Sequence, residues 1–205
     1  MMAPVETFGF TPRELRTLRS LRTPAGVQKY LDAMPYHLAD TAWSPRSVLR
    51  ENTAHCLEGA IFAAAALRVI GFPPLLMDFE AVNDTDHVIA PFRLHGAWGA
   101  VAKSNYAGCR GREPVYRSLR ELAMSYFNDY FNLRGKRTMR RYSRPIDLKR
   151  FDSQHWMTTG RSVWFIAEHL VDIPHITVLT PAMVRGLTNV DRRGIDAGLA
   201  GRRWK

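Results

Sequence analysis

NTAHCLEGAIFAAAALRVIG, residues 52–71, is the stretch that decides the fold. Alanine, leucine, isoleucine and phenylalanine fill it on nearly all sides, which predicts one buried helix. Asn52 or Thr53 is expected to cap its start, and Gly71 ends it. The Pro-Pro pair that follows prevents its continuation. The rest of the domain is therefore expected to pack around this helix.

Sequence patterns on both sides of the buried helix predict further helices and strands. Before it, two Thr-Pro pairs and one Ser-Pro pair place a capping hydroxyl ahead of a proline, which is typical of helix starts. After it, apolar runs separated by polar turns are typical of strands. The expected helices cover 12–22, 25–33, 45–51, 114–132 and 161–173. The expected strands cover 75–82, 87–94 and 97–104, and the last two pair in antiparallel fashion.

This order of elements predicts the α+β class, with one antiparallel β-sheet packed on the central helix. The chain has 205 residues, of which 46% are hydrophobic, and this suits one domain with a real core. We expect a single domain over 1–185, with its core at about 45–110. Residues 186–205 are glycine-rich and basic, and we expect a flexible tail there.

The composition favours a reduced, cytoplasmic protein. Two cysteines give neither a disulfide framework nor a paired metal motif. The first residues lack the apolar segment of a signal peptide, and the longest apolar run is too short to cross a bilayer. We therefore expect no membrane partner, no metal and no cofactor.

A strong positive charge suggests an acidic partner. The net charge is +10, and residues 134–150 carry eight basic residues and one acidic residue. Such a run is usually a solvated face, but it can also recruit nucleic acid or an acidic protein. Tyr142 lies between Arg141 and Arg144, and an aromatic ring among arginines can stack on single-stranded nucleic acid.

Cys56 is the candidate nucleophile, because the start of a helix lowers the pKa of a thiol. A thiol also needs a base, and histidine is the usual one. His87 opens the second expected strand and is the best candidate. A third group should hold the far nitrogen of its imidazole. A two-residue loop of His95 and Gly96 would place Ser104 opposite His87.

A three-residue loop would instead place Asn105 opposite His87. An asparagine side-chain oxygen accepts from an imidazole N–H better than a serine oxygen does. The predicted catalytic residues are therefore Cys56, His87 and Asn105, with Ser104 as the alternative third group.

These residues resemble the transglutaminase-like, papain-related cysteine superfamily. AHCLEGAIFAAAALRVIGFPPLL is similar to that family's cysteine helix and first strand, DHVIAPFR to its histidine strand, and GAWGAVAKSNYAG to its third strand. The resemblance covers about residues 45–110. Residues 110–170 are similar to segments that accompany this core in bacterial proteins. Family members include protein-crosslinking enzymes, proteases and amidases.

The resemblance implies acyl transfer on an amide bond through a thioester at Cys56, with His87 as base and a peptide or protein as substrate. The family commonly has an aspartate four residues after a tryptophan; here Trp98 matches, but the aspartate position holds Ala102. Either Asn105 or Ser104 substitutes, or the site is a dyad, or catalysis has been lost. The alternative function is therefore a degenerate binding module that uses its basic face.

Overall fold

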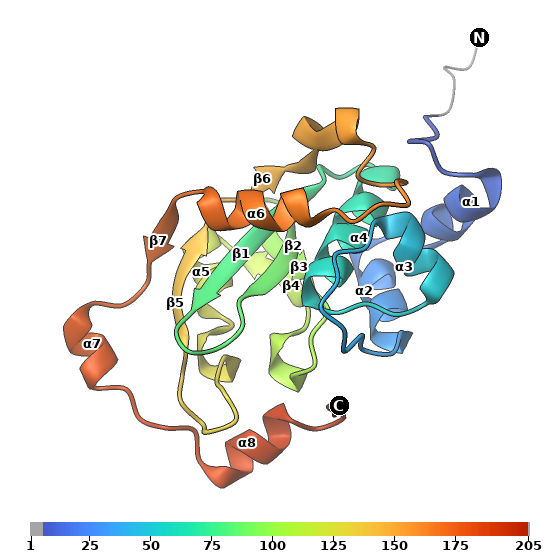
Figure 1. Ribbon diagram of the computed structural model, residues 1–205. Coiled ribbons are helices and arrows are strands. Elements are labelled where there is room, and N and C mark those ends of the chain that lie inside the picture. The colour runs from blue at the N-terminus through green and yellow to red at the C-terminus, as the bar shows by residue number, and fades with distance from the viewer. Residues whose placement is uncertain (1–5, 205) are drawn as a thin grey trace.

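The structure, a computed structural model that describes residues 6–204, is built around one antiparallel sheet (Figure 1). The strand order is β4-β3-β2-β1-β5-β7, and β6 also pairs with β1. The predicted α+β class is confirmed. The strands are β1 (Leu75–Ala81), β2 (His87–Leu94), β3 (Ala97–Val101), β4 (Arg112–Tyr116), β5 (Met139–Ser143), β6 (Ile146–Asp147) and β7 (His175–Thr177).

Three short helices precede the buried helix, as the Thr-Pro and Ser-Pro pairs predict. The side chains of Thr11, Thr23 and Ser44 each accept a hydrogen bond from a backbone N–H in the first turn of the following helix. These hydroxyls satisfy donors that the helix itself cannot pair. The helices are α1 (Pro12–Ser20), α2 (Pro24–Ala33) and α3 (Pro45–Glu51).

The buried helix is α4 (Cys56–Val69), and its start corrects the prediction. Asn52 does not cap it, because Asn52 ends α3 in the left-handed conformation, with φ of 51°. Thr53 does not cap it either, and the N-cap residue is His55. All residues from Leu57 to Leu67 are buried. Cys56 is therefore the first helical residue, where backbone N–H groups lack acceptors within the helix.

The sheet has two covered faces, which follow from the alternation of side chains along β1. Leu76 packs in the core that contains α4, whereas Met77 and Phe79 pack in a second cluster. The second cluster includes α5 (Leu119–Met124) and the short 3-10 helix η2 (Phe127–Asp129).

The prediction of one helix over 114–132 is therefore wrong. Its first part forms the edge strand β4, and only the later part forms α5 and η2. The apolar stripe is real, since Leu122, Ala123 and Tyr126 are buried together. The pairing of β4 with β3 outweighs the helical periodicity of this segment.

The basic stretch 134–150 contains β5, a strand that the sequence analysis does not predict. β5 pairs with β1 and β7 inside the sheet. Arg141 forms an ion pair with Glu80 on the neighbouring strand. Tyr142 is only 6% exposed, so the idea that its ring stacks on nucleic acid is wrong.

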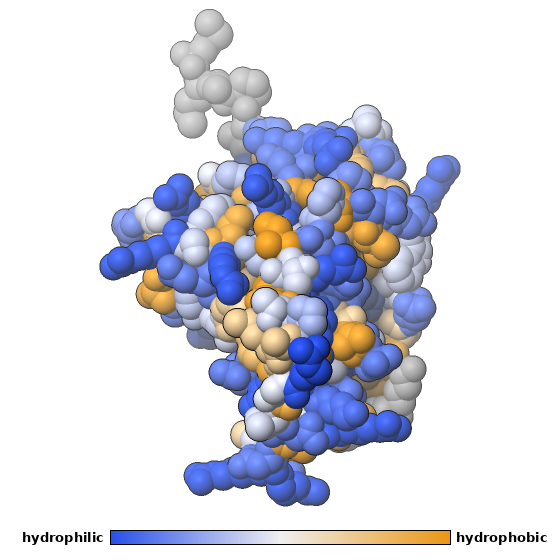
Figure 2. Space-filling model, turned by 90° about the vertical axis from the view of Figure 1, so that its left-hand side faces the viewer, coloured by the Kyte–Doolittle hydropathy of each residue, from blue (hydrophilic) through white to orange (hydrophobic). Residues whose placement is uncertain are grey.

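The last third of the chain crosses the sheet and then runs around its outside (Figure 1). Helix α6 (Trp164–Asp172) matches the predicted helix and is followed by β7, α7 (Pro181–Arg185) and α8 (Arg192–Gly198). The face that carries β7 and α7 is mostly hydrophilic, with small separate apolar patches (Figure 2). The expected tail 186–205 thus contains α8, and Arg202, which follows α8, lines the cavity described below.

Candidate active site

Cys56 and His87 line one cavity of about 580 Å³ at the end of the sheet. The cavity passes around the start of β2, where β3 has already ended at Val101 and leaves the edge of β2 unpaired. Cys56 reaches this edge from α4, and His87 reaches it from the opposite face of the sheet. The structure therefore brings together the two residues on which the catalytic prediction depends.

The sulfur of Cys56 lies beside the backbone that flanks His87. Its Sγ is 4.0 Å from the main-chain oxygen of Asp86. Burial raises the pKa of the Cys56 thiol, and the nearby Leu57, Val88 and Tyr36 offset only part of that effect. The resting site thus holds a neutral thiol.

His87 is held by a main-chain carbonyl. Its Nε2 lies 2.9 Å from the oxygen of Cys109. Because a carbonyl only accepts, Nε2 carries the hydrogen and Nδ1 holds the free electron pair. Burial lowers the pKa of His87 to about 4, so the ring is neutral at pH 7.

The free nitrogen of His87 belongs to a ring that lines the cavity. Nδ1 has no hydrogen-bond partner within residues 6–204. It is also not one of the fully buried polar atoms without a partner in that part of the chain. No hydrogen bond joins the ring to Cys56 in the described structure. The two groups therefore line one cavity without a hydrogen bond between them.

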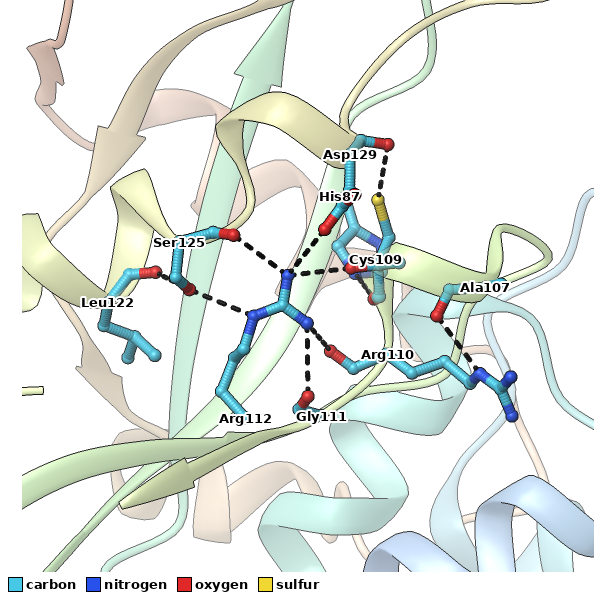
Figure 3. A network of polar contacts seen from close by, with 10 residues as sticks. His87, Ala107, Cys109, Arg110, Gly111, Arg112, Leu122, Ser125 and Asp129 are labelled. Carbon is cyan, nitrogen blue, oxygen red and sulfur yellow. Dashed lines mark hydrogen bonds and ion pairs between the residues drawn. The ribbon is translucent and has the colours of Figure 1, made fainter. Parts of the chain in front are cut away.

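A network around Arg112 fixes the carbonyl that holds His87 (Figure 3). The guanidinium donates to the main-chain oxygens of Gly108 and Ser125 and forms an ion pair with Asp129. It also lies 3.9 Å from the centre of the Tyr126 ring. Arg112 therefore ties the loop that carries Cys109 to the second core cluster.

The Cys109 side chain is structural. Its Sγ donates to the main-chain oxygen of Asp129 at 3.3 Å. Burial raises the pKa of this thiol to about 12, so it is protonated at neutral pH. Cys109 thus contributes its carbonyl to the site and not its sulfur.

The predicted third groups bind elsewhere. The loop between β2 and β3 is the two-residue His95-Gly96 form, with positive φ at both positions, and Leu94 pairs with Ala97. Ser104, the alternative, accepts from the N–H of Tyr106. The Asn105 amide binds the main chain of Arg203 and not His87. No side-chain pattern could have revealed the carbonyl, because every residue carries one.

Glu58 organises the start of α4 and was not predicted. Its carboxylate is fully buried and accepts from the N–H groups of His55 and Trp43 and from the hydroxyl of Thr41. His37 lies 2.9 Å away. The signal was present in the sequence, since a glutamate three residues after an N-cap is typical of a capping box. His55 also anchors this start, since its Nε2 lies 2.6 Å from the main-chain oxygen of Thr41.

A second buried histidine lies on the same side of the sheet as Cys56. His175 Nε2 is 2.9 Å from Asp78 Oδ2, and its Nδ1 is 2.8 Å from the oxygen of Ile173. Both ring nitrogens donate a hydrogen bond to these oxygens, and the bond to Asp78 raises the pKa of His175. Asp78 lines the cavity, but His175 has no nitrogen left for Cys56.

Residues 6–204 hold neither a candidate metal site nor a candidate membrane span. No group of three His, Cys, Asp or Glu side chains in that range is placed to hold a metal ion. No helix in that range is long and apolar enough to cross a membrane. The sequence matches no protein-family model and no curated protein. The resemblance to the transglutaminase-like superfamily therefore rests on the residues quoted for it.

Proposed function

We propose that the protein catalyses thiol-dependent acyl transfer on an amide bond, with Cys56 as nucleophile and His87 as base. One observation carries the proposal. The bond from His87 Nε2 to the Cys109 carbonyl leaves Nδ1 free on a ring that lines the same cavity as Cys56. In this tautomer the ring can accept the proton of a thiol.

The proposed chemistry starts from neutral groups. As Cys56 Sγ attacks the substrate carbonyl carbon, its proton moves to His87 Nδ1. The protonated ring then gives this proton to the leaving nitrogen as the C–N bond breaks, and a thioester remains on Cys56. Water or an amine then attacks the thioester and regenerates the thiol.

The Cys109 carbonyl supports the charged intermediate state of the ring. It accepts the Nε2 hydrogen throughout and can stabilise the imidazolium while it holds the proton. A main-chain carbonyl carries only a partial charge, so this support is weaker than that of an aspartate. This hydrogen bond raises the pKa of His87, but burial lowers it by more.

The first turn of α4 supplies donors for the oxyanion. Backbone N–H groups there have no acceptor within the helix, and that of Leu57 already points at the sulfur. Such donors stabilise the negative charge that develops on the substrate oxygen. The distance between Cys56 and His87 is expected to shorten when substrate binds, since catalytic hydrogen bonds are often long in empty sites.

A generic acyl donor tests the proposal without knowledge of the substrate. We expect 4-nitrophenyl acetate to acetylate Cys56, as detected by mass spectrometry of proteolytic fragments. Cys56→Ala should lose this acetylation and the fast release of nitrophenolate. The matched control is Cys109→Ser, which keeps a donor to Asp129 and should keep both. Wild-type nitrophenolate release by Cys56→Ala would overturn the proposal and leave the binding-module alternative.

A further inference from the structure

The end of the chain returns to the candidate active site. After α7, the N–H of Val190 donates to the oxygen of Gly135 at 2.8 Å. Gly198 at the end of α8 lies against the ring of Phe131, where a Cβ atom would be 2.4 Å from the ring. These contacts bring residues 199–204 beneath the sheet (Figure 1).

The Asn105 side chain forms hydrogen bonds with the main chain of this segment. Its Nδ2 donates to the oxygen of Arg203, and its Oδ1 accepts from the N–H of the same residue, each at 2.9 Å. A side-chain amide that pairs with both polar groups of one residue imitates a neighbouring strand. It would hold any extended peptide, because no side chain takes part.

Arg202 enters the cavity that contains Cys56. Its guanidinium lies 4.9 Å from the centre of the Tyr106 ring and 4.6 Å from that of Trp204, which is cation–π geometry. The segment therefore shares a cavity with the candidate nucleophile.

The cavity and the chain as a whole differ in charge. Although the net charge of the chain is +10, five aspartates line the cavity. Asp78 and Asp129 have cationic partners. Asp40, Asp84 and Asp86 form no ion pair within residues 6–204. The cavity therefore favours a cationic ligand.

We propose that this cavity is a binding cleft for an extended peptide that contains arginine, and that residues 199–204 occupy it as an internal ligand. The proposal names the substrate class of the proposed function and rests on that function only in calling the peptide a substrate. The contacts that hold the segment come from Asn105 and Tyr106 and not from Cys56.

Two matched variants of the full chain separate the internal ligand from its competitors. Arg202→Glu reverses the charge that enters the cavity. Arg203→Glu makes the same change in net charge, but its side chain is exposed and only its main chain is bound. Both variants are made with Cys56→Ala, so that no turnover interferes, and their folding is checked by thermal unfolding.

Fluorescence anisotropy then measures the binding of labelled LAGRRW, the sequence of residues 199–204, and of LAGEEW as control. A tethered ligand competes strongly because of its high effective concentration, so we expect Arg202→Glu to bind LAGRRW at least about 10-fold more tightly than Arg203→Glu does. Adding Asn105→Ala to Arg202→Glu should remove this gain.

Three results would overturn the proposal: equal binding by the two variants, no binding by either, or equal binding of LAGRRW and LAGEEW. The outcome is independent of the proposed function, because peptide binding without acetylation of Cys56 would leave the cleft in place and remove only the chemistry. Acetylation without peptide binding would do the reverse.

Discussion

Two buried histidines flank the cavity of Cys56, and their surroundings give them opposite properties. His175 has an acceptor at each nitrogen, one of them the carboxylate of Asp78. His87 has one main-chain carbonyl and a free Nδ1. The pKa is raised for His175 by its hydrogen bond to Asp78, and it is lowered for His87 to about 4 by burial. Of the two, only His87 has a ring nitrogen that could accept the Cys56 proton in the proposed reaction.

The largest expected difference between the two histidines is in their titration. We predict that NMR of 15N-labelled imidazoles shows His87 as the neutral Nε2–H tautomer at pH 7. His175 should titrate with a pKa above the usual value for histidine. Their midpoints should differ by more than about two pH units. His175→Gln assigns the signals. Overlapping titrations would remove the contrast.

Removing Asp78, the side-chain partner of His175, should reduce the stability of the fold. Asp78→Ala removes the hydrogen-bond acceptor of the His175 side chain, which is only 5% exposed, so we expect the free energy of unfolding to fall by about 2 kcal/mol. Asp78→Asn keeps a hydrogen-bond acceptor and should lose less. Urea unfolding measures both. A loss for Asp78→Ala within measurement error would mean that the pair carries no structural role.

The carbonyl that holds His87 can be loosened through Arg112. We expect Arg112→Ala to slow acetylation of Cys56 at pH 7 about 10-fold, because a misplaced ring accepts the proton poorly. The pKa of His87 should rise, since the charge of Arg112 helps to lower it. Reaction at high pH, where the thiol ionises without a base, should stay unchanged. An equal loss at both pH values would indicate general disruption.

The smallest predicted effect is a pH dependence of stability. His175 has a raised pKa in the folded state, so its contribution is fully present below its unfolded pKa of about 6.5 and is lost as the pH rises through the folded value. The difference in unfolding free energy between the wild type and His175→Gln should therefore narrow from pH 6 to pH 9. A difference that widens over this range would contradict the assignment.

Sequence reasoning predicted the parts that depend on local patterns. The capped helices, the cysteine helix and the hairpin through His95-Gly96 are set by hydroxyl caps, apolar periodicity and turn residues. It missed β5 because arginines interrupt the alternation there, and Arg141 is satisfied only by Glu80 on a strand far away in the sequence. The prediction of a helix over 114–132 was wrong because the first part of that segment pairs with β3 as strand β4.

The candidate site divides in the same way. Cys56 and His87 could be predicted because a thiol at a helix start and an imidazole on a nearby strand are recognisable side-chain types. The carbonyl of Cys109 and the pairing of Asn105 with Arg203 could not, since main-chain groups leave no mark in a sequence. The contacts of His175 with Asp78 join residues from two distant strands.

The most direct test of the central claim compares the two histidines in one reaction. The rate of Cys56 acetylation by 4-nitrophenyl acetate is measured at pH 7 in the wild type, His87→Gln and His175→Gln. If His87 is the base, its replacement should slow acetylation about 100-fold, whereas His175→Gln should remain within about threefold of the wild type. A wild-type rate in His87→Gln would contradict the account.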